Sequence, residues 1–198
     1  MASIDVTDTA DANNMRDGIP RLQASALDPG LRQYLCPTVD RLGYLGEFFQ
    51  ALGHAPAAVI QFMEFTRTLR SSLNERENEV IALAVCALLG IEYERIQHER
   101  LAHRLGLSHE WIAAAEGLPG TPPGVLNREE SALRQLAVAI ASRGGARCSE
   151  EIRAVAKALG PAKAVAALLQ VARYIMITHL CNALDLQLPV RSIFDTAN

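Results

Sequence analysis

The stretch NERENEVIALAVCALLG at residues 74–90, followed by IEYERIQHERLAHRLGL at residues 91–107, decides the fold of this chain. Asn74 is followed three residues later by Glu77, the spacing of a capping box at a helix start. The run Val80–Leu89 is apolar on every side. A helix of that kind is buried on all faces, so we expect the rest of the molecule to pack around it.

The second half of the stretch predicts another helix, from about Ile91 to Leu105, ended by Gly106. At 100° per residue, Glu94 and His98 fall on the same stripe as its apolar side chains. The charged residues predicted to lie off that stripe are Glu92, Glu99, Arg100, His103 and Arg104. A carboxylate and an imidazole on a buried face are costly unless they partner each other or a bound molecule. Glu94 and His98 are therefore candidate site residues.

Composition favours closely packed helices. Of the 198 residues, 49% are hydrophobic and only 5% are aromatic, and runs typical of strands are few. We therefore expect an all-α protein with about eight helices. Its many apolar helices should leave surface that is buried between subunits, so a homo-oligomer is expected.

Charge and hydropathy exclude several function classes. The net charge of −3 provides no basic patch, so we expect no nucleic-acid partner. No apolar run reaches the roughly 20 residues that cross a bilayer, and Val80–Leu89 is about half that length, so no membrane partner is expected. Residues 1–14 are polar and acidic and lack the core of a signal peptide. A cytoplasmic location follows as the expectation.

The four cysteines show no redox or metal pattern. They are widely and irregularly spaced, and no CxxC pair occurs among Cys36, Cys86, Cys148 and Cys181. We expect reduced, mostly structural thiols. No spacing of histidines, cysteines and acids asks for a metal, and no cofactor is expected.

Breaker residues divide the chain into its expected helices. The predicted helices span residues 30–35, 38 or 40–52, 57–71, 74–89, 91–105, 109–115, 128–142, 149–159 and 162–184. The segment GLPGTPPG at residues 117–124 is expected to join two halves of one domain. We expect a partly disordered N-terminal extension over residues 1–25, a single domain over 26–190 and a tail over 191–198.

Three ordered segments carry a resemblance to a known family. They are NERENEVIALAVCALLG, then EYERIQHERLAHRLGLSHEWIAAAEG, then YIMITHLCNALDLQLP, at residues 74–90, 92–117 and 174–189. Together they resemble the carboxymuconolactone decarboxylase and alkylhydroperoxidase-D-like family, over roughly residues 42–189. The resemblance implies an all-α fold that assembles into dimers, trimers or hexamers.

The resemblance also implies site residues. In the peroxidase branch, a CxxC pair begins the helix, a histidine follows four residues after its second cysteine, and a glutamate lies on the preceding helix. The histidine corresponds to His98 and the glutamate to Glu79, but the cysteine positions correspond to Ile91 and Glu94. A thiolate is the group that attacks peroxide. An alkylhydroperoxidase-like antioxidant activity is therefore the disfavoured alternative.

The remaining acid–base set favours the non-redox members of the family. Glu79, Glu94, His98 and Tyr93 are the candidate catalytic residues, and the expected activity is cofactor-free decarboxylation or a related reaction on a small carboxylate or lactone. Each residue also has a purely structural interpretation. His98 and Glu94 could pair within the core. Glu79 and Glu94 could be ordinary acids in the first turn of a helix, where they stabilise the helix dipole, and Tyr93 could form a subunit contact. A non-catalytic helical oligomer that binds a small ligand is thus a further alternative.

Overall fold

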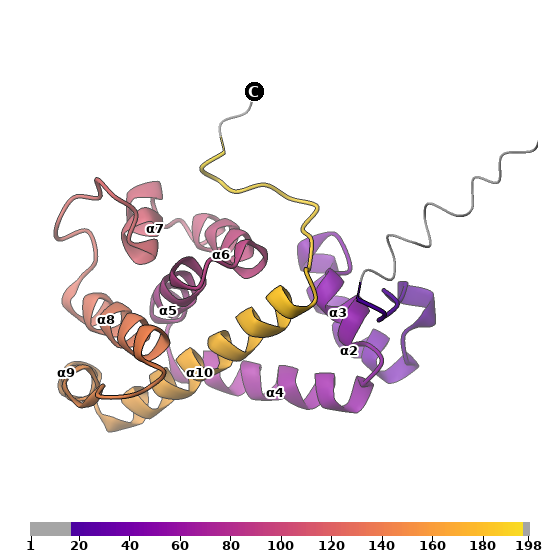
Figure 1. The fold of residues 1–198 in the computed structure, drawn as a ribbon, viewed down its shortest axis with the longest axis horizontal. Coiled ribbons are helices and arrows are strands. Elements are labelled where there is room, and N and C mark those ends of the chain that lie inside the picture. Colours follow the sequence, from indigo (N-terminus) through magenta and orange to yellow (C-terminus); the bar gives the residue numbers. More distant parts are fainter. Residues whose placement is uncertain (1–16, 196–198) are drawn as a thin grey trace, which may run out of the picture. The chain divides into compact units, whose positions relative to one another are not determined.

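The computed structural model describes residues 17–195. Within that range it contains nine α-helices, one short 3-10 helix and no strand. The elements are η1 (Ala24–Ala26), α2 (Pro29–Leu42), α3 (Glu47–Leu52), α4 (Pro56–Ser72), α5 (Glu75–Leu88), α6 (Glu92–Arg104), α7 (His109–Glu116), α8 (Arg128–Arg143), α9 (Ser149–Leu159) and α10 (Pro161–Ala183) (Figure 1). The prediction of an all-α fold with about eight helices is confirmed for the described residues.

The chain divides into two compact units. The first unit comprises residues 1–64 and 184–188, and the second comprises residues 65–183 and 189–198. Helix α4 begins in the first unit and ends in the second. The predicted boundaries of a single domain at residues 26–190 stay a prediction. The predicted N-terminal extension lies outside the described residues as far as residue 16, and the tail does so from residue 196.

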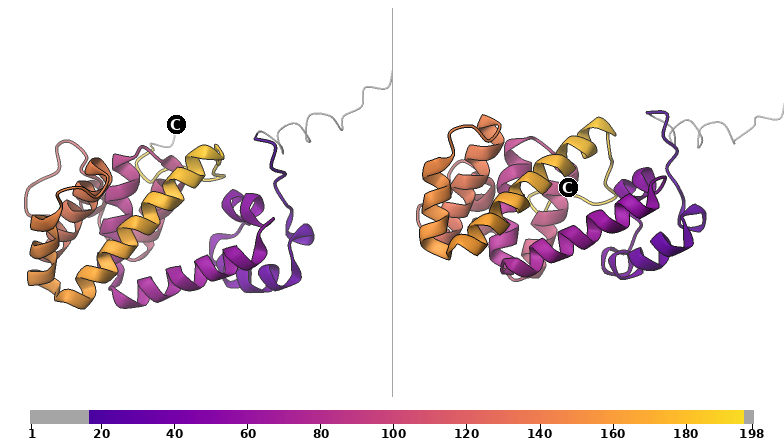
Figure 2. Two further views of the ribbon diagram at one scale, coloured as in Figure 1. Left: turned by 60° about the horizontal axis from the view of Figure 1, so that its bottom comes forward. Right: turned by 90° about the horizontal axis from the view of Figure 1, so that it is seen from below.

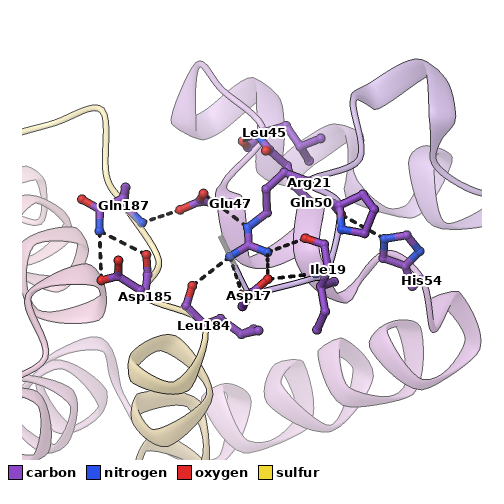
Figure 3. A network of polar contacts seen from close by, with 11 residues as sticks. Asp17, Ile19, Arg21, Leu45, Glu47, Gln50, His54, Leu184, Asp185 and Gln187 are labelled. Carbon is purple, nitrogen blue, oxygen red and sulfur yellow. Dashed lines mark hydrogen bonds and ion pairs between the residues drawn. The ribbon is translucent and has the colours of Figure 1, made fainter. Parts of the chain in front are cut away.

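A buried arginine holds the first unit together. Arg21 is 3% exposed and binds both carboxylate oxygens of Asp17, at 2.9 and 2.8 Å. Its Nε donates to Glu47 on α3 at 3.3 Å, and its Nη2 donates to the carbonyl oxygen of Leu184 at 2.8 Å (Figure 3). One guanidinium therefore ties the start of the described chain to α3 and to the segment that follows α10.

The first two helices differ from the prediction. Pro37 was expected to end a short helix, but it lies inside α2, which continues to Leu42. Leu31 and Leu35 are buried at 0% and 1% exposure, whereas Pro37 lies on the exposed side, where its ring and missing N–H are tolerated. The expected single helix to Leu52 is also wrong. Gly43 adopts a left-handed conformation with φ 81°, which separates α2 from α3.

The second unit is built around α5. This helix contacts α6, α7, α8 and α10, and it occupies the middle of the unit in Figure 1. All its residues from Val80 to Cys86 are at most 1% exposed. Asn74 and Glu77 form the expected capping box at its start, with hydrogen bonds of 2.8 Å in both directions. The prediction of a buried central helix is confirmed as far as Cys86, whereas Leu88 at its end is 44% exposed.

Helix α10 corrects the expectation about apolar length. Its 23 residues are long and apolar enough to cross a membrane by length and composition alone. In the structure, 56% of its most apolar window is buried inside the molecule. It runs along the second unit and contacts α5, α8 and α9 (Figure 2). The buried side of α10 also carries polar residues, Gln170, Arg173 and Thr178. The apolar composition of α10 is therefore explained by its place in the core of the second unit.

Candidate active site

The turn between α5 and α6 positions the candidate site. Leu89 follows α5, and Gly90 takes a left-handed conformation with φ 68°. The N–H of Ile91 then donates to the carbonyl oxygen of Cys86 at 3.0 Å. This tight connection folds α6 back against α5. Glu79 on α5 and His98 on α6, which are 19 positions apart in the sequence, can therefore contact each other.

His98 and Glu79 form the centre of the site. The Nδ1 of His98 lies 2.6 Å from Oε2 of Glu79. Glu79 has no exposed surface, and His98 is 8% exposed. A carboxylate that binds Nδ1 fixes the orientation of the imidazole and leaves Nε2 for other partners.

Glu94 lies on the opposite side of the imidazole. Its Oε2 is 3.6 Å from the Nε2 of His98, beyond ordinary hydrogen-bond length, and its side chain is 15% exposed. Glu79 and Glu94 therefore both lie beside the imidazole of His98, but only Glu79 is within hydrogen-bond distance of it.

The two carboxylates favour a charged imidazole. Burial, which is the largest single effect, lowers the pKa of His98. The negative charge of Glu79, its hydrogen bond and the nearby Glu94 outweigh burial and raise that pKa from 6.5 to about 9. At neutral pH, His98 is therefore an imidazolium that donates from Nδ1 to Glu79, and its Nε2 carries a second proton.

Arg70 completes the environment of Glu79. The Nη2 of Arg70 lies 3.5 Å from Oε1 of Glu79, and its side chain is 35% exposed. That oxygen has no hydrogen bond among the described residues, so the contact is an ion pair only. Glu79 thus lies between two basic side chains, His98 and Arg70.

Two residues of α6 are more buried than a single apolar stripe predicts. Tyr93, for which a subunit contact was the structural interpretation, is 5% exposed within the chain. Glu99 was expected off that stripe, and it has no exposed surface. Helix α6 is covered on more than one face, because α5, α7 and α10 all contact it. A single apolar stripe underestimates the burial of such a helix.

Glu99 belongs to a second polar cluster, which local sequence patterns do not reveal. It accepts hydrogen bonds from Arg95 and from the hydroxyl of Ser192 near the C-terminus. Glu116 at the end of α7 lies 3.7 Å from Arg95 and is 7% exposed. Burial, and then the charge of Glu99, raise the pKa of Glu116 from 4.5 to about 8. This cluster fastens the C-terminal segment to α6.

Helix α10 contributes two neighbours that the sequence analysis missed. The ring of Tyr174 meets the ring of His98 edge-on, with centroids 5.1 Å apart and planes 84° apart. The guanidinium of Arg173 stacks over the same tyrosine ring at 3.9 Å. Tyr174 begins the third segment of the family resemblance, and that position is the one signal that could have indicated it.

The cysteines are poorly suited to redox chemistry. All four are free, and Cys86, Cys148 and Cys181 are buried. Burial and the charge of Glu94 raise the pKa of the Cys86 and Cys181 thiols well above their ordinary value. A thiol whose pKa is raised by burial is a weak nucleophile, since the thiolate is the reactive form. Within residues 17–195, no group of three His, Cys, Asp or Glu side chains could hold a metal ion.

Comparisons with known proteins agree with this architecture. The model of the carboxymuconolactone decarboxylase family matches residues 54–137, a segment that contains Glu79, Glu94 and His98. No curated protein sequence is significantly similar to the chain.

Several solved structures share the fold. A variant of the debrominase Bmp8 in complex with 2,3,4-tribromopyrrole has a TM-score of 0.76 at 18% identity, with 88% of this chain and 92% of that chain covered. A peroxidase-related protein with an alkylhydroperoxidase AhpD core, from Ralstonia eutropha JMP134, has a TM-score of 0.69 at 17% identity, over 82% and 87% of the chains. The putative antioxidant defence protein ATU0492 from Agrobacterium tumefaciens has a TM-score of 0.61 at 19% identity, over 71% and 96%.

The described residues have an all-α, AhpD-like fold. The segment at residues 54–137 is similar to the carboxymuconolactone decarboxylase family.

Proposed function

We propose that the protein is a cofactor-free acid–base enzyme that decarboxylates a small carboxylate or lactone, or carries out a closely related reaction. The observation that carries this proposal is the pair formed by His98 and Glu79. An imidazolium whose Nδ1 is held at 2.6 Å by a buried carboxylate presents its Nε2 proton in a defined direction. Such a group is a positioned general acid.

The proposed step needs no other reactant than a proton. The bond between a substrate carbon and its carboxylate breaks, carbon dioxide leaves, and the electron pair stays on the conjugated remainder of the substrate. The Nε2 of His98 then gives its proton to that carbon. Glu94, 3.6 Å from Nε2 and partly exposed, lies where a proton from solvent can return to the imidazole. Glu79 stays bound to Nδ1 of His98 during the step, and Arg70 lies on the other side of this carboxylate.

The size of the substrate is inferred from relatives and from the family. The debrominase Bmp8 was solved with 2,3,4-tribromopyrrole, a small ring. A small cyclic acid, such as an unsaturated lactone that carries a carboxylate, has comparable dimensions. Such a compound can also delocalise the electrons that decarboxylation leaves behind.

A peroxidase function is the weaker alternative. Ile91 and Glu94 occupy the positions of the family's reactive cysteines, and the pKa of the buried Cys86 thiol is raised. We expect no turnover of an organic hydroperoxide in the presence of a dithiol. Turnover that depends on Cys86 would support the peroxidase instead.

The test combines a substrate panel with one site variant. Purified protein is incubated with small unsaturated lactone acids, and release of carbon dioxide is followed at neutral pH. For the substrate that reacts, we expect His98→Asn to lower kcat by about a hundredfold or more, the usual contribution of a general acid. Glu92→Gln, an exposed carboxylate on the same helix, is the matched control and should leave kcat unchanged.

Full activity of His98→Asn would contradict the role of His98. A panel without any turnover would favour the remaining alternative, a non-catalytic helical oligomer that binds a small ligand. Assembly into a homo-oligomer and a location in the cytoplasm remain part of this proposal.

A further inference from the structure

Two adjacent residues of α10 are buried polar groups without complete hydrogen bonding. Arg173 is 6% exposed, and Tyr174 has no exposed surface. The hydroxyl of Tyr174 has no hydrogen-bond partner in the described part of the chain. Buried polar groups in folded proteins are nearly always paired, so the hydroxyl of Tyr174 is an exception that calls for an explanation.

The guanidinium of Arg173 is held firmly by its neighbours. Its Nε donates to Oε1 of Gln170 at 3.0 Å, and Gln170 in turn donates to Asn78 of α5 at 2.8 Å. The plane of the guanidinium lies over the ring of Tyr174 at 3.9 Å. The side chain therefore has a defined direction before any ligand binds, which lowers the entropy cost of binding.

The two Nη nitrogens of Arg173 have no hydrogen-bond acceptor among the described residues. No residue between 17 and 195 accepts a hydrogen bond from the Nη nitrogens of Arg173 or pairs its charge with a carboxylate. These nitrogens are also not closed off from solvent, unlike the hydroxyl of Tyr174. A guanidinium in this state presents a planar fork of donors, which matches a carboxylate.

This fork lies next to the proposed acid. Tyr174 contacts Arg173 with its face and His98 with its edge, so both cations border one aromatic ring. The charged groups around that ring are two carboxylates, Glu79 and Glu94, and three cations, Arg70, Arg173 and protonated His98. The cluster therefore contains more basic than acidic side chains, which favours an anionic ligand.

We infer that Arg173 binds the anionic group of a small ligand of the carboxylate class, beside the ring of Tyr174 that also contacts His98. Tyr174 is a positioning residue that fixes the guanidinium relative to the imidazole. The identification of this ligand as a substrate rests on the proposed function. The binding itself does not, since it needs only the charge and donor geometry of Arg173.

The test measures binding without turnover. Benzoate is titrated into the protein by calorimetry, and the imidazole signal of His98 is followed by NMR in parallel. We expect benzoate to bind in the millimolar range and to shift the His98 signal, whereas the uncharged analogue benzamide should do neither. Arg173→Gln should weaken benzoate binding about tenfold or more and abolish the shift, because a charge-assisted hydrogen bond is lost.

Two further variants separate recognition from folding. Arg173→Lys keeps the charge but loses the planar fork, so its affinity should lie between those of the wild type and Arg173→Gln. Arg143→Gln removes an arginine that is 48% exposed and paired with Glu151, and it should bind benzoate like the wild type. Circular dichroism of each variant verifies the helical fold.

Equal affinity of the wild type and folded Arg173→Gln would overturn the inference, as would the absence of benzoate binding to the wild type. Failure of the proposed function has a different signature. In that case the wild type binds benzoate through Arg173, but no decarboxylation is found for it. The two hypotheses can therefore fail separately.

Discussion

At the scale of single residues, the decisive property of the site is the charge of His98. Burial alone would leave this imidazole neutral, because desolvation penalises its charged form. Glu79 reverses that outcome from 2.6 Å and raises the pKa to about 9. The proton proposed for catalysis is therefore present at neutral pH because of one neighbouring carboxylate.

Removing that carboxylate should discharge the imidazole. In Glu79→Gln, the pKa of His98 is expected to fall from about 9 by about one unit or more, since burial is then opposed by Glu94 alone. NMR titration of the imidazole C–H signals measures this pKa. Glu92→Gln is the control, because Glu92 is 80% exposed and pairs with Arg95. A pKa that stays near 9 in Glu79→Gln would rule out Glu79 as the cause.

The same variant should alter the pH dependence of stability. A pKa that is higher in the folded state stabilises the fold fully below pH 6.5, and this contribution is lost as pH rises through about 9. The free energy of unfolding should therefore fall between these values in the wild type. Urea denaturation at several pH values should give a shallower fall in Glu79→Gln.

At the scale of helices, the start of α8 joins three elements. Glu130 accepts from the backbone N–H of Asn127 at 2.9 Å, which closes a capping box. The same carboxylate accepts from Arg76 of α5 at 2.5 Å and from the indole of Trp111 on α7 at 3.1 Å. These hydrogen bonds outweigh its burial and lower the pKa of Glu130. Glu130 therefore caps α8 and also links this helix to α5 and α7.

Replacement of Glu130 tests this double role. Glu130→Ala should lower the free energy of unfolding by about 2 to 3 kcal/mol, more than the ~1 kcal/mol of a lost cap, because a buried indole N–H and Arg76 also lose their acceptor. Glu129→Ala is the matched control, one position earlier in the same first turn, and should change it by about 0.5 kcal/mol or less. Similar decreases in the free energy of unfolding of both variants would show that the contacts of Glu130 with α5 and α7 contribute little to stability. Urea denaturation measures both.

At the scale of the whole molecule, the outer side of α10 has no partner within the described chain that covers it. Val165, Leu169 and Met176 are exposed by 55%, 43% and 44%. They lie four and then seven residues apart, which aligns them on one face of the helix. A stripe of this kind is suited to burial against the same stripe on a second copy of the chain.

Assembly should depend on that stripe. Light scattering of the wild type at micromolar concentration is expected to give the mass of a homo-oligomer. The double variant Leu169→Glu, Met176→Glu should shift it toward the monomer, because charges would be buried in the interface. Leu118→Glu, at an exposed apolar residue of a loop, should have no such effect. A monomeric wild type would contradict the prediction of an oligomer.

Much of the second unit was predictable because its signals are local. The capping boxes at Asn74 and Asn127 and the all-round apolar run of α5 each lie within a few residues. The failures in the first unit are equally physical. A proline breaks a helix only if nothing else holds it, and the buried Leu31 and Leu35 hold α2 through Pro37.

The sequence by itself determined the all-α class, the central helix and the placement of Glu94 and His98 one turn apart, because helical periodicity and caps act over short distances. Glu79 entered through the resemblance to a family, and no local pattern pairs it with His98. Only the tertiary structure decided that Glu79 is the close partner of the imidazole and that Arg173 and Tyr174 of α10 lie beside it. Those contacts join three helices that are distant in the chain, and packing, not periodicity, selects which of their polar side chains meet.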